Sequence, residues 1–194
     1  ESLGIKVWPS LDYEADDALG SAAIKFSQLD EVDQVVICSV DKDLCQMVSG
    51  EKIVCLDRKN RKIYNEKEVE NKFGVLPSSI PDYLGLMGDS ADGIPGILKW
   101  GSKSASTLLS RYLKIENIPN NYALWDVKVR GAETLSRNLE ESRQMAYLYK
   151  QLATIKTDVI INENISDLSW SGVNTEDFVQ ICDELGLLSL KSFI

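Results

Sequence analysis

The chain has 194 residues, a formal net charge of −9 and no histidine. The lack of histidine excludes catalysis by a histidine base and any zinc site that needs an imidazole ligand. Hydrophobic residues make up 44% and charged residues 26% of the chain, as in ordinary globular domains. No apolar run approaches the ~20 residues that a membrane-spanning helix needs, so we expect no membrane contact.

The cysteines indicate the cellular location of the protein, and the charge distribution indicates its class of partner. The four cysteines do not form a CxxC motif, and Cys38 and Cys55 lie in strand-like apolar runs, where we expect reduced, buried thiols. Reduced thiols favour a cytoplasmic location.

The net negative charge of the chain argues against a nucleic-acid partner. However, residues 94–115 contain four basic residues and no acidic one: Lys99, Lys103, Arg111 and Lys114.

The hydrophobic pattern alternates between strand-like and helix-like segments in the first third of the chain. Strands are predicted over 3–8, 35–39 and 53–56, and helices over 13–29 and 41–48. This alternation predicts an α/β fold with parallel strands. Later segments predict helices near 66–73, 79–87, 102–113, 132–153 and 175–186, with one short strand at 158–161.

The distribution of these elements predicts two units. Residues 1–75 form the C-terminal part of an α/β core, and residues 76–194 form a helical subdomain. Only about three strands can be found in the core, fewer than a parallel sheet usually has. The first strand also begins at once, so we expect an N-terminal part of the fold to be absent from this chain.

Seven carboxylates occur in three short clusters where predicted strands or helices begin or end. They are Glu14, Asp16 and Asp17; Asp41 and Asp43; and Asp89 and Asp92. If the fold brought them together, their mutual repulsion and desolvation would raise their pKa values unless a cation neutralised them. Oxygen ligands without imidazole or thiolate suit Mg²⁺ or Mn²⁺. The three clusters together therefore predict a divalent metal site.

Each cluster taken alone also has an ordinary structural explanation. Acids such as Glu14 in the first turn of a helix are stabilised by the helix dipole. Asp41 is suited to a turn or a helix N-cap, and Asp89 to a turn. Asp41 also follows a predicted buried strand, and ligands of open α/β sheets bind at the carboxyl ends of strands. No single cluster identifies the site.

A glycine- and lysine-containing turn, Gly96 to Lys103, precedes the helix predicted to start at residue 102. Glycine allows backbone N–H groups to approach a phosphate, and the new helix presents its positive N-terminus to it. Lys103 in the first helical turn is unfavourable for the helix dipole, and a bound anion would explain it. The alternative is a plain helix–helix turn with a solvated lysine.

These stretches together resemble the 5′ nuclease family. The family includes the 5′→3′ exonuclease domain of bacterial DNA polymerase I, phage 5′ nucleases and, more distantly, flap endonucleases. The matching segments are YEADD at 13–17, SVDKDLCQMV at 39–48, PDYLGLMGDSADGIPGI at 81–97, GSKSAS at 101–106 and LATIKTDV at 152–159. Their order and spacing follow the family over almost the whole chain.

The resemblance implies a PIN-like or resolvase-like core and a helix-hairpin-helix over 96–112 that binds the DNA backbone. It implies phosphodiester hydrolysis with two Mg²⁺ ions, or Mn²⁺ in their place, and a K⁺ ion at the hairpin. Five acids would be catalytic metal ligands: Glu14, Asp16, Asp41, Asp43 and Asp92. Asp17 and Asp89 would support the metals. The DNA contacts would be Gly96, Lys99, Gly101, Ser102, Lys103 and Ser104. Duplex or flapped DNA, and a fused or separate DNA polymerase, would be the partners.

The sequence departs from the family in two places. Lys99-Trp100-Gly101 stands where the family usually has Gly-Ile-Gly, so an ammonium group replaces one backbone contact with the phosphate. The first strand, with its catalytic aspartate, and the helical arch are expected before residue 1. We therefore expect this chain alone to be a weak or inactive nuclease.

Two other functions remain open. A non-catalytic duplex-binding module would keep the hairpin, but costly unpaired carboxylates argue against it. A Mg²⁺-dependent phosphohydrolase of small phosphates would suit Asp41 and Asp43, but it would need no hairpin to grip a duplex.

Overall fold

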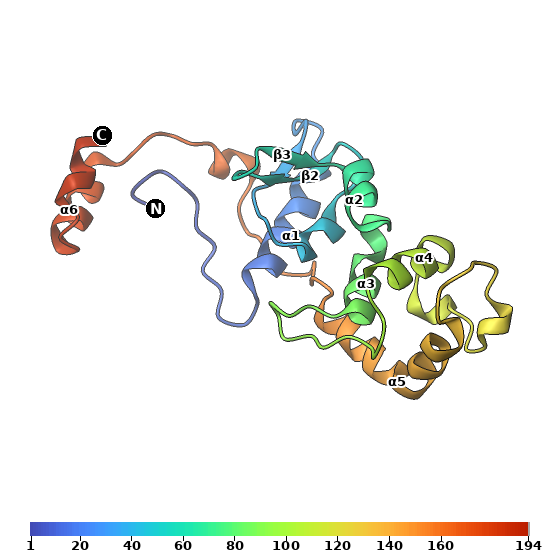
Figure 1. The fold of residues 1–194 in the computed structure, drawn as a ribbon. Coiled ribbons are helices and arrows are strands. Elements are labelled where there is room, and N and C mark those ends of the chain that lie inside the picture. The colour runs from blue at the N-terminus through green and yellow to red at the C-terminus, as the bar shows by residue number, and fades with distance from the viewer. Residues whose placement is uncertain (194) are drawn as a thin grey trace.

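The chain forms a small sheet with helices packed against it, a helical region and a projecting C-terminal arm (Figure 1). The computed structural model describes residues 1–193. The helices and strands are α1 (Ala15–Ser27), β1 (Val35–Ile37), β2 (Ile53–Asp57), β3 (Lys62–Tyr64), α2 (Glu66–Phe73), α3 (Ile80–Met87), α4 (Ser102–Tyr112), α5 (Ala132–Leu152) and α6 (Thr175–Glu184). Within residues 1–193, no helix is both long and apolar enough to cross a membrane.

The sheet has the order β1-β2-β3 and is mixed rather than purely parallel. β1 runs parallel to β2, with Val36 opposite Val54, and β2 runs antiparallel to β3, with Leu56 opposite Ile63. The α/β class is therefore confirmed. The sequence did not indicate β3, because its three residues are too few to establish an alternating pattern.

Helix α1 packs against β1 through an apolar stripe. Ala18, Ala22 and Phe26 recur every four residues and are all buried, as expected for the inner face of an amphipathic helix. The helix begins with a capping box, in which the Glu14 N–H donates to Asp17 Oδ2 at 3.3 Å. The cap fixes where the first acid cluster lies relative to the sheet.

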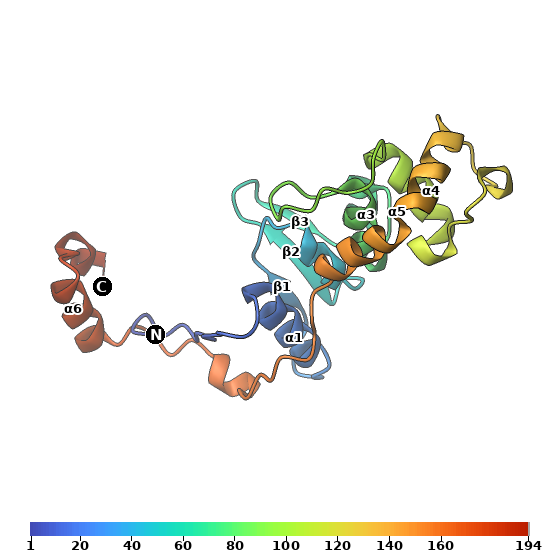
Figure 2. The ribbon, with the colours of Figure 1, turned by 90° about the horizontal axis from the view of Figure 1, so that it is seen from below.

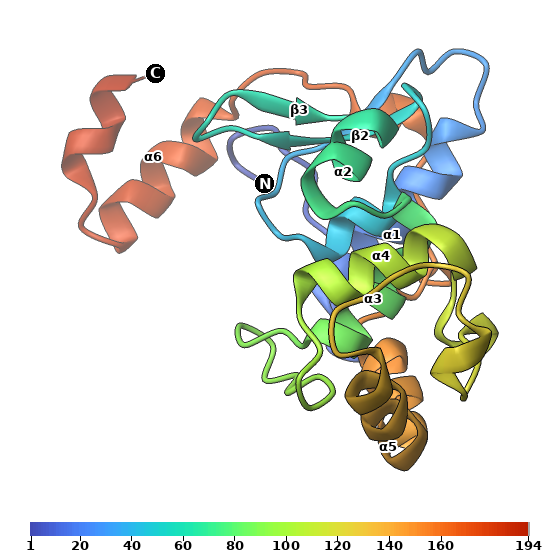
Figure 3. The same ribbon diagram turned by 45° about the vertical axis from the view of Figure 1, so that its right-hand side comes forward.

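Helix α3 lies between α4 and α5 and connects the sheet to the helical region (Figure 3). Gly85 allows the close approach of α5, because a Cβ at this position would lie 2.9 Å from the Lys150 backbone nitrogen. Most of the buried hydrophobic side chains form one cluster that extends from Ala23 of α1 to Ile155 beyond α5, and Ala22, Phe26 and Ile161 form a second, smaller one. The acid-bearing segments are thus attached to one packed core.

Three local predictions are wrong. Residues 3–8 and 158–161 are not strands. The N-terminal segment instead runs beside the C-terminal arm (Figures 1 and 2), where the Trp170 indole N–H donates to the Leu3 carbonyl at 2.9 Å. An apolar run becomes a strand only if a neighbour completes its hydrogen bonds, and neither run has one. Cys38 is exposed rather than buried, because β1 already ends at Ile37.

Candidate metal centre

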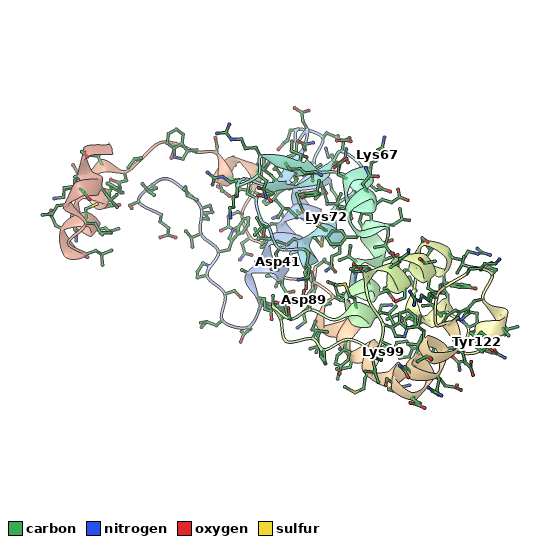
Figure 4. The ribbon with its side chains drawn as sticks, viewed as in Figure 1. Asp41, Lys67, Lys72, Asp89, Lys99 and Tyr122 are labelled. Carbon is green, nitrogen blue, oxygen red and sulfur yellow. The ribbon has the colours of Figure 1, made fainter. Side chains whose placement is uncertain are left out.

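Three segments bring the acid clusters together: the start of α1, the turn after β1 and the loop after α3. Asp41 and Asp89 lie near each other in Figure 4, although 48 positions separate them in the sequence. The first two segments meet because α1 packs against β1. The third reaches them because α3 packs against the short 3₁₀ helix Asp43–Met47.

The turn after β1 is held by its own polar groups. The Asp41 N–H donates to Ser39 Oγ at 3.1 Å, and the Asp43 N–H donates to Asp41 Oδ1 at 3.0 Å. This arrangement is an Asx-type turn that leads into the 3₁₀ helix. Leu44 and Cys45 of that helix are buried in the core. The turn that carries these carboxylates is therefore fixed to the hydrophobic core.

The loop after α3 is tightly closed. Asp89 and Ile94 exchange two backbone hydrogen bonds, each 2.7 Å long. At the base, a Cβ on Gly96 would lie 2.5 Å from the Gly88 nitrogen, and both glycines have positive φ angles. Only glycine fits such a close backbone approach without strain. The tip of the loop carries Asp92.

One cleft collects most of the predicted metal ligands. Its acidic lining consists of Glu14, Asp16, Asp41, Asp43 and Asp92, and Tyr149 and Leu152 of α5 contribute to the wall. Asp43, Asp89 and Asp92 each contribute a carboxylate oxygen, and these oxygens lie within 4.8 Å of one another. We call these three residues the acid cluster.

Asp89 and Asp17 have partners within the protein. Asp89 is 3% exposed, forms an ion pair with Lys42 and accepts the Ala91 N–H at 3.0 Å. Asp17 does not line this cleft. Its Oδ1 accepts the Lys156 N–H at 2.8 Å, and its Oδ2 accepts the Glu14 N–H.

Burial and mutual repulsion destabilise the charged forms of Asp43 and Asp16 in the cleft, whereas, despite burial, Lys42 lowers the pKa of Asp89. Burial, followed by the charges of Asp41, Asp92 and Asp89, raises the pKa of Asp43 from 3.8 to about 7. Burial and then Asp41 also raise the pKa of Asp16. Asp43 Oδ1 is buried and has no hydrogen-bond partner among residues 1–193. Carboxylate oxygens in this state fit a hard divalent cation, which would reverse these shifts.

Lys42 and two residues of α5 were not identified from the sequence. Burial lowers the pKa of Lys42, but the hydrogen bond and charge of Asp89 outweigh this and raise it. The signal available was a lysine between two acids in Asp41-Lys42-Asp43. Leu152 begins the segment LATIKTDV, but nothing in the sequence placed it or Tyr149 in the cleft, because their place depends on how α5 packs.

The predicted DNA-contacting residues of the hairpin lie in the segment that precedes α4 and in the first turn of α4. Lys99 has a φ angle of 68°, a left-handed conformation that favours glycine, and its side chain is exposed. The buried Trp100 anchors the turn, since its indole N–H donates to the Leu135 carbonyl at 3.1 Å. The Gly101 N–H donates to Ser104 Oγ at 3.0 Å as α4 begins. The backbone thus keeps a glycine-like path although lysine occupies position 99.

Family models match nearly the whole chain. Residues 1–74 match the 5′-3′ exonuclease N-terminal resolvase-like domain, and residues 75–176 match the 5′-3′ exonuclease C-terminal SAM fold. A 5′-3′ exonuclease of Buchnera aphidicola from Schizaphis graminum is 40% identical over 84% of this chain and 56% of its own length. DNA polymerase I of Bacillus subtilis is 36% identical over 92% of this chain and 20% of its own length.

A solved structure has the same fold. The T5 D15 protein, co-crystallised with metal ions, superimposes with a TM-score of 0.62 at 18% identity, over 77% of this chain and 53% of that one. The chain spans about half the length of the stand-alone exonuclease relative, which is matched over 56% of its length. On the two family models and these relatives, the chain belongs to the 5′-3′ exonuclease family.

Proposed function

We propose that this chain carries the metal-binding and DNA-gripping parts of a 5′→3′ exonuclease or flap endonuclease that hydrolyses DNA phosphodiesters. The observation that carries the proposal is the acid cluster, in which Asp43 has a strongly raised pKa and a buried oxygen without a partner. Burying a carboxylate without a partner costs free energy, and a bound divalent cation would offset this cost.

Mg²⁺, as two ions, is the proposed metal, with Mn²⁺ as a substitute. Its proposed ligands are Glu14, Asp16, Asp41, Asp43 and Asp92, with Asp17 and Asp89 in support. Bound divalent ions would supply Lewis-acid chemistry for the attack of water and the departure of the leaving oxygen. Asp17 positions the start of α1 through its bonds to Glu14 and Lys156, and Lys42 holds Asp89 against the cluster.

The proposed DNA contacts lie on the hairpin: Gly96, Lys99, Gly101, Ser102, Lys103 and Ser104. The N–H groups at the first positions of α4 have no acceptor within the helix, which makes its N-terminus suited to a phosphate. Lys99 and Lys103 are exposed and form no ion pair within residues 1–193, so both are available to the backbone of a duplex. A K⁺ ion at this turn is also proposed.

We propose the same two units that the sequence predicts: a core over 1–75 and a helical subdomain over 76–194. Residue 194 lies outside the residues that the structure describes. The matches to DNA polymerase I support a polymerase, fused or separate, as a partner on flapped DNA. A cytoplasmic setting follows from the same role.

Urea unfolding with and without Mg²⁺ tests the metal site. At a Mg²⁺ concentration 100 times the dissociation constant, the free energy of unfolding should rise by about 2.7 kcal/mol. Asp43→Asn should abolish most of this gain, whereas Asp33→Asn, which removes an exposed acid outside the cleft, should keep it. Equal stabilisation of both variants would remove Asp43 from the site.

Cleavage of a flapped oligonucleotide with Mg²⁺ tests the activity. We expect slow cleavage by this chain, lost in Asp43→Asn, and faster cleavage by a version extended at its N-terminus. Hydrolysis of p-nitrophenyl phosphate without DNA cleavage would favour a small-molecule phosphohydrolase. DNA binding with no cleavage by either version would favour a non-catalytic module.

A further inference from the structure

The turn between β2 and β3 is unusually basic for this acidic chain. Its residues Arg58, Lys59, Asn60 and Arg61 are all exposed, and we call them the basic turn. We propose that the basic turn is a second nucleic-acid contact, which binds the phosphates of the 5′ single strand after that strand leaves the duplex. This proposal rests on the proposed nuclease function.

The basic turn has a defined shape. Asp57 accepts hydrogen bonds from the Asn60 backbone N–H at 2.9 Å and from Asn60 Nδ2 at 2.7 Å. Arg61 has a φ angle of 52°, which reverses the chain into β3. Asp57, the acid that precedes the turn, therefore closes the turn, and Arg58, Lys59 and Arg61 are exposed to solvent.

The positive charge of the basic turn is not used within the protein. Arg58, Lys59 and Arg61 form no ion pair within residues 1–193. The next basic residue is different, because Lys62 pairs with Glu68 at 2.8 Å. Three unpaired cations within four positions make a local positive field in a chain of net charge −9. A polyanion is the ligand that this field favours.

The sheet places the basic turn at the same end as the acid-bearing turn after β1. β1 and β2 are parallel, with Ile37 opposite Cys55, so the carboxyl ends of both strands lie together. β2 then continues to Asp57 and enters the basic turn. In Figures 1 and 2, the loop that carries Asp89 lies between this turn and the helical region. In Figure 4, Lys99 lies on the helical side of Asp89.

This order favours a single strand as the occupant. A duplex bound at Lys99 and Lys103 is too stiff to bend around the protein toward the basic turn, so it continues in a straight line. A displaced single strand is flexible and can follow the surface from the acid cluster to the basic turn. Arginine is suited to this role, because its planar guanidinium can bind phosphate oxygens in pairs.

Salt-dependent binding of labelled oligonucleotides in EDTA tests the proposal without cleavage. The probes are a duplex with a 5′ oligothymidylate flap and the same duplex without it. Replacing Arg58, Lys59 and Arg61 together by Gln should lower the log–log salt slope for the flapped probe by about two units, at ~0.7 per phosphate contact. The slope for the plain duplex should not change.

Matched variants separate the possible outcomes. Lys67→Gln, which removes an exposed charge on α2, should leave both slopes unchanged, and Lys103→Gln should lower both. Equal losses on both probes in the triple variant would assign the turn to the duplex and overturn the proposal. Unchanged DNA binding with lost binding to polyglutamate would assign it to an acidic polypeptide. If the unaltered chain binds neither probe, the proposed function itself fails.

Discussion

Two acids near α3, the buried Asp82 and the half-buried Asp43, differ in how their charge is balanced. Asp82 is 1% exposed, pairs with Lys150 at 2.8 Å and accepts the Ile115 N–H at 2.8 Å. Asp43 in the acid cluster is surrounded by other acids and keeps one buried oxygen without a partner. The chain supplies its own counter-charge to Asp82, whereas we propose that a bound cation supplies that of Asp43. Burial nevertheless raises the pKa of Asp82, so its partners only partly offset the cost of burying its charge.

The largest expected effect concerns Asp82 and its partner Lys150. Asp82→Ala should lower the free energy of unfolding by about 3 kcal/mol, because it removes the buried partner of the half-buried Lys150 and the acceptor of the Ile115 N–H. Lys150 retains Glu116 at 2.8 Å, so the loss should stay near the lower end for a broken buried pair. Urea unfolding measures it. The double variant Asp82→Asn/Lys150→Met should be less destabilised than Asp82→Ala; greater destabilisation would contradict this account.

The second prediction concerns the acid cluster without a divalent cation. The pKa of Asp43 is raised in the fold, so its contribution to stability is complete below 3.8 and is lost as the pH rises to about 7. Asp43→Asn should therefore be more stable than the unaltered chain at pH 8, by about 1–2 kcal/mol after allowing for partial exposure. Urea unfolding at pH 4 and pH 8 in EDTA measures the difference. A loss of stability at pH 8 would show that Asp43 has a partner within the protein.

The smallest effect concerns the hairpin. Lys99→Gly should stabilise the fold by about 1 kcal/mol, because glycine adopts the left-handed conformation at no steric cost. The same change should weaken DNA binding through the loss of a cation. Thermal unfolding and the salt slope of duplex binding measure the two effects. Stronger DNA binding by the glycine variant would show that the Lys99 side chain obstructs the backbone.

The sequence predicted the elements whose pattern is local. Helix α2, for example, occupies residues 66–73 as expected, because Asn65 caps its start and Gly74 ends it in a left-handed conformation. Strand predictions at 3–8 and 158–161 were wrong, since an apolar run does not reveal whether a neighbouring strand exists. The short β3 was missed for the complementary reason, because it depends on pairing with β2.

The candidate site was predictable to a similar extent. Charge and spacing identified the seven acids and the hairpin lysines. They did not indicate which of the acids have hydrogen-bond or ion-pair partners within the protein. Asp17 and Asp89 are held by backbone groups and Lys42, while Asp43 is not. That distinction depends on which N–H groups and cations the fold brings within reach. The place of Tyr149 in the cleft likewise depends on the packing of α5.

The close contact between Gly88 and Gly96 has a consequence for where a substrate would be cut. The loop closed by these glycines carries Asp92 at its tip, and the hairpin begins at its base. On the proposed function, one tightly closed segment would therefore bind the duplex at its base and carry a metal ligand at its tip. The length of this segment would set the number of nucleotides between the site of duplex binding and the site of cleavage. A methyl group at either glycine would alter this spacing, so the cleavage position should shift along with any loss of rate.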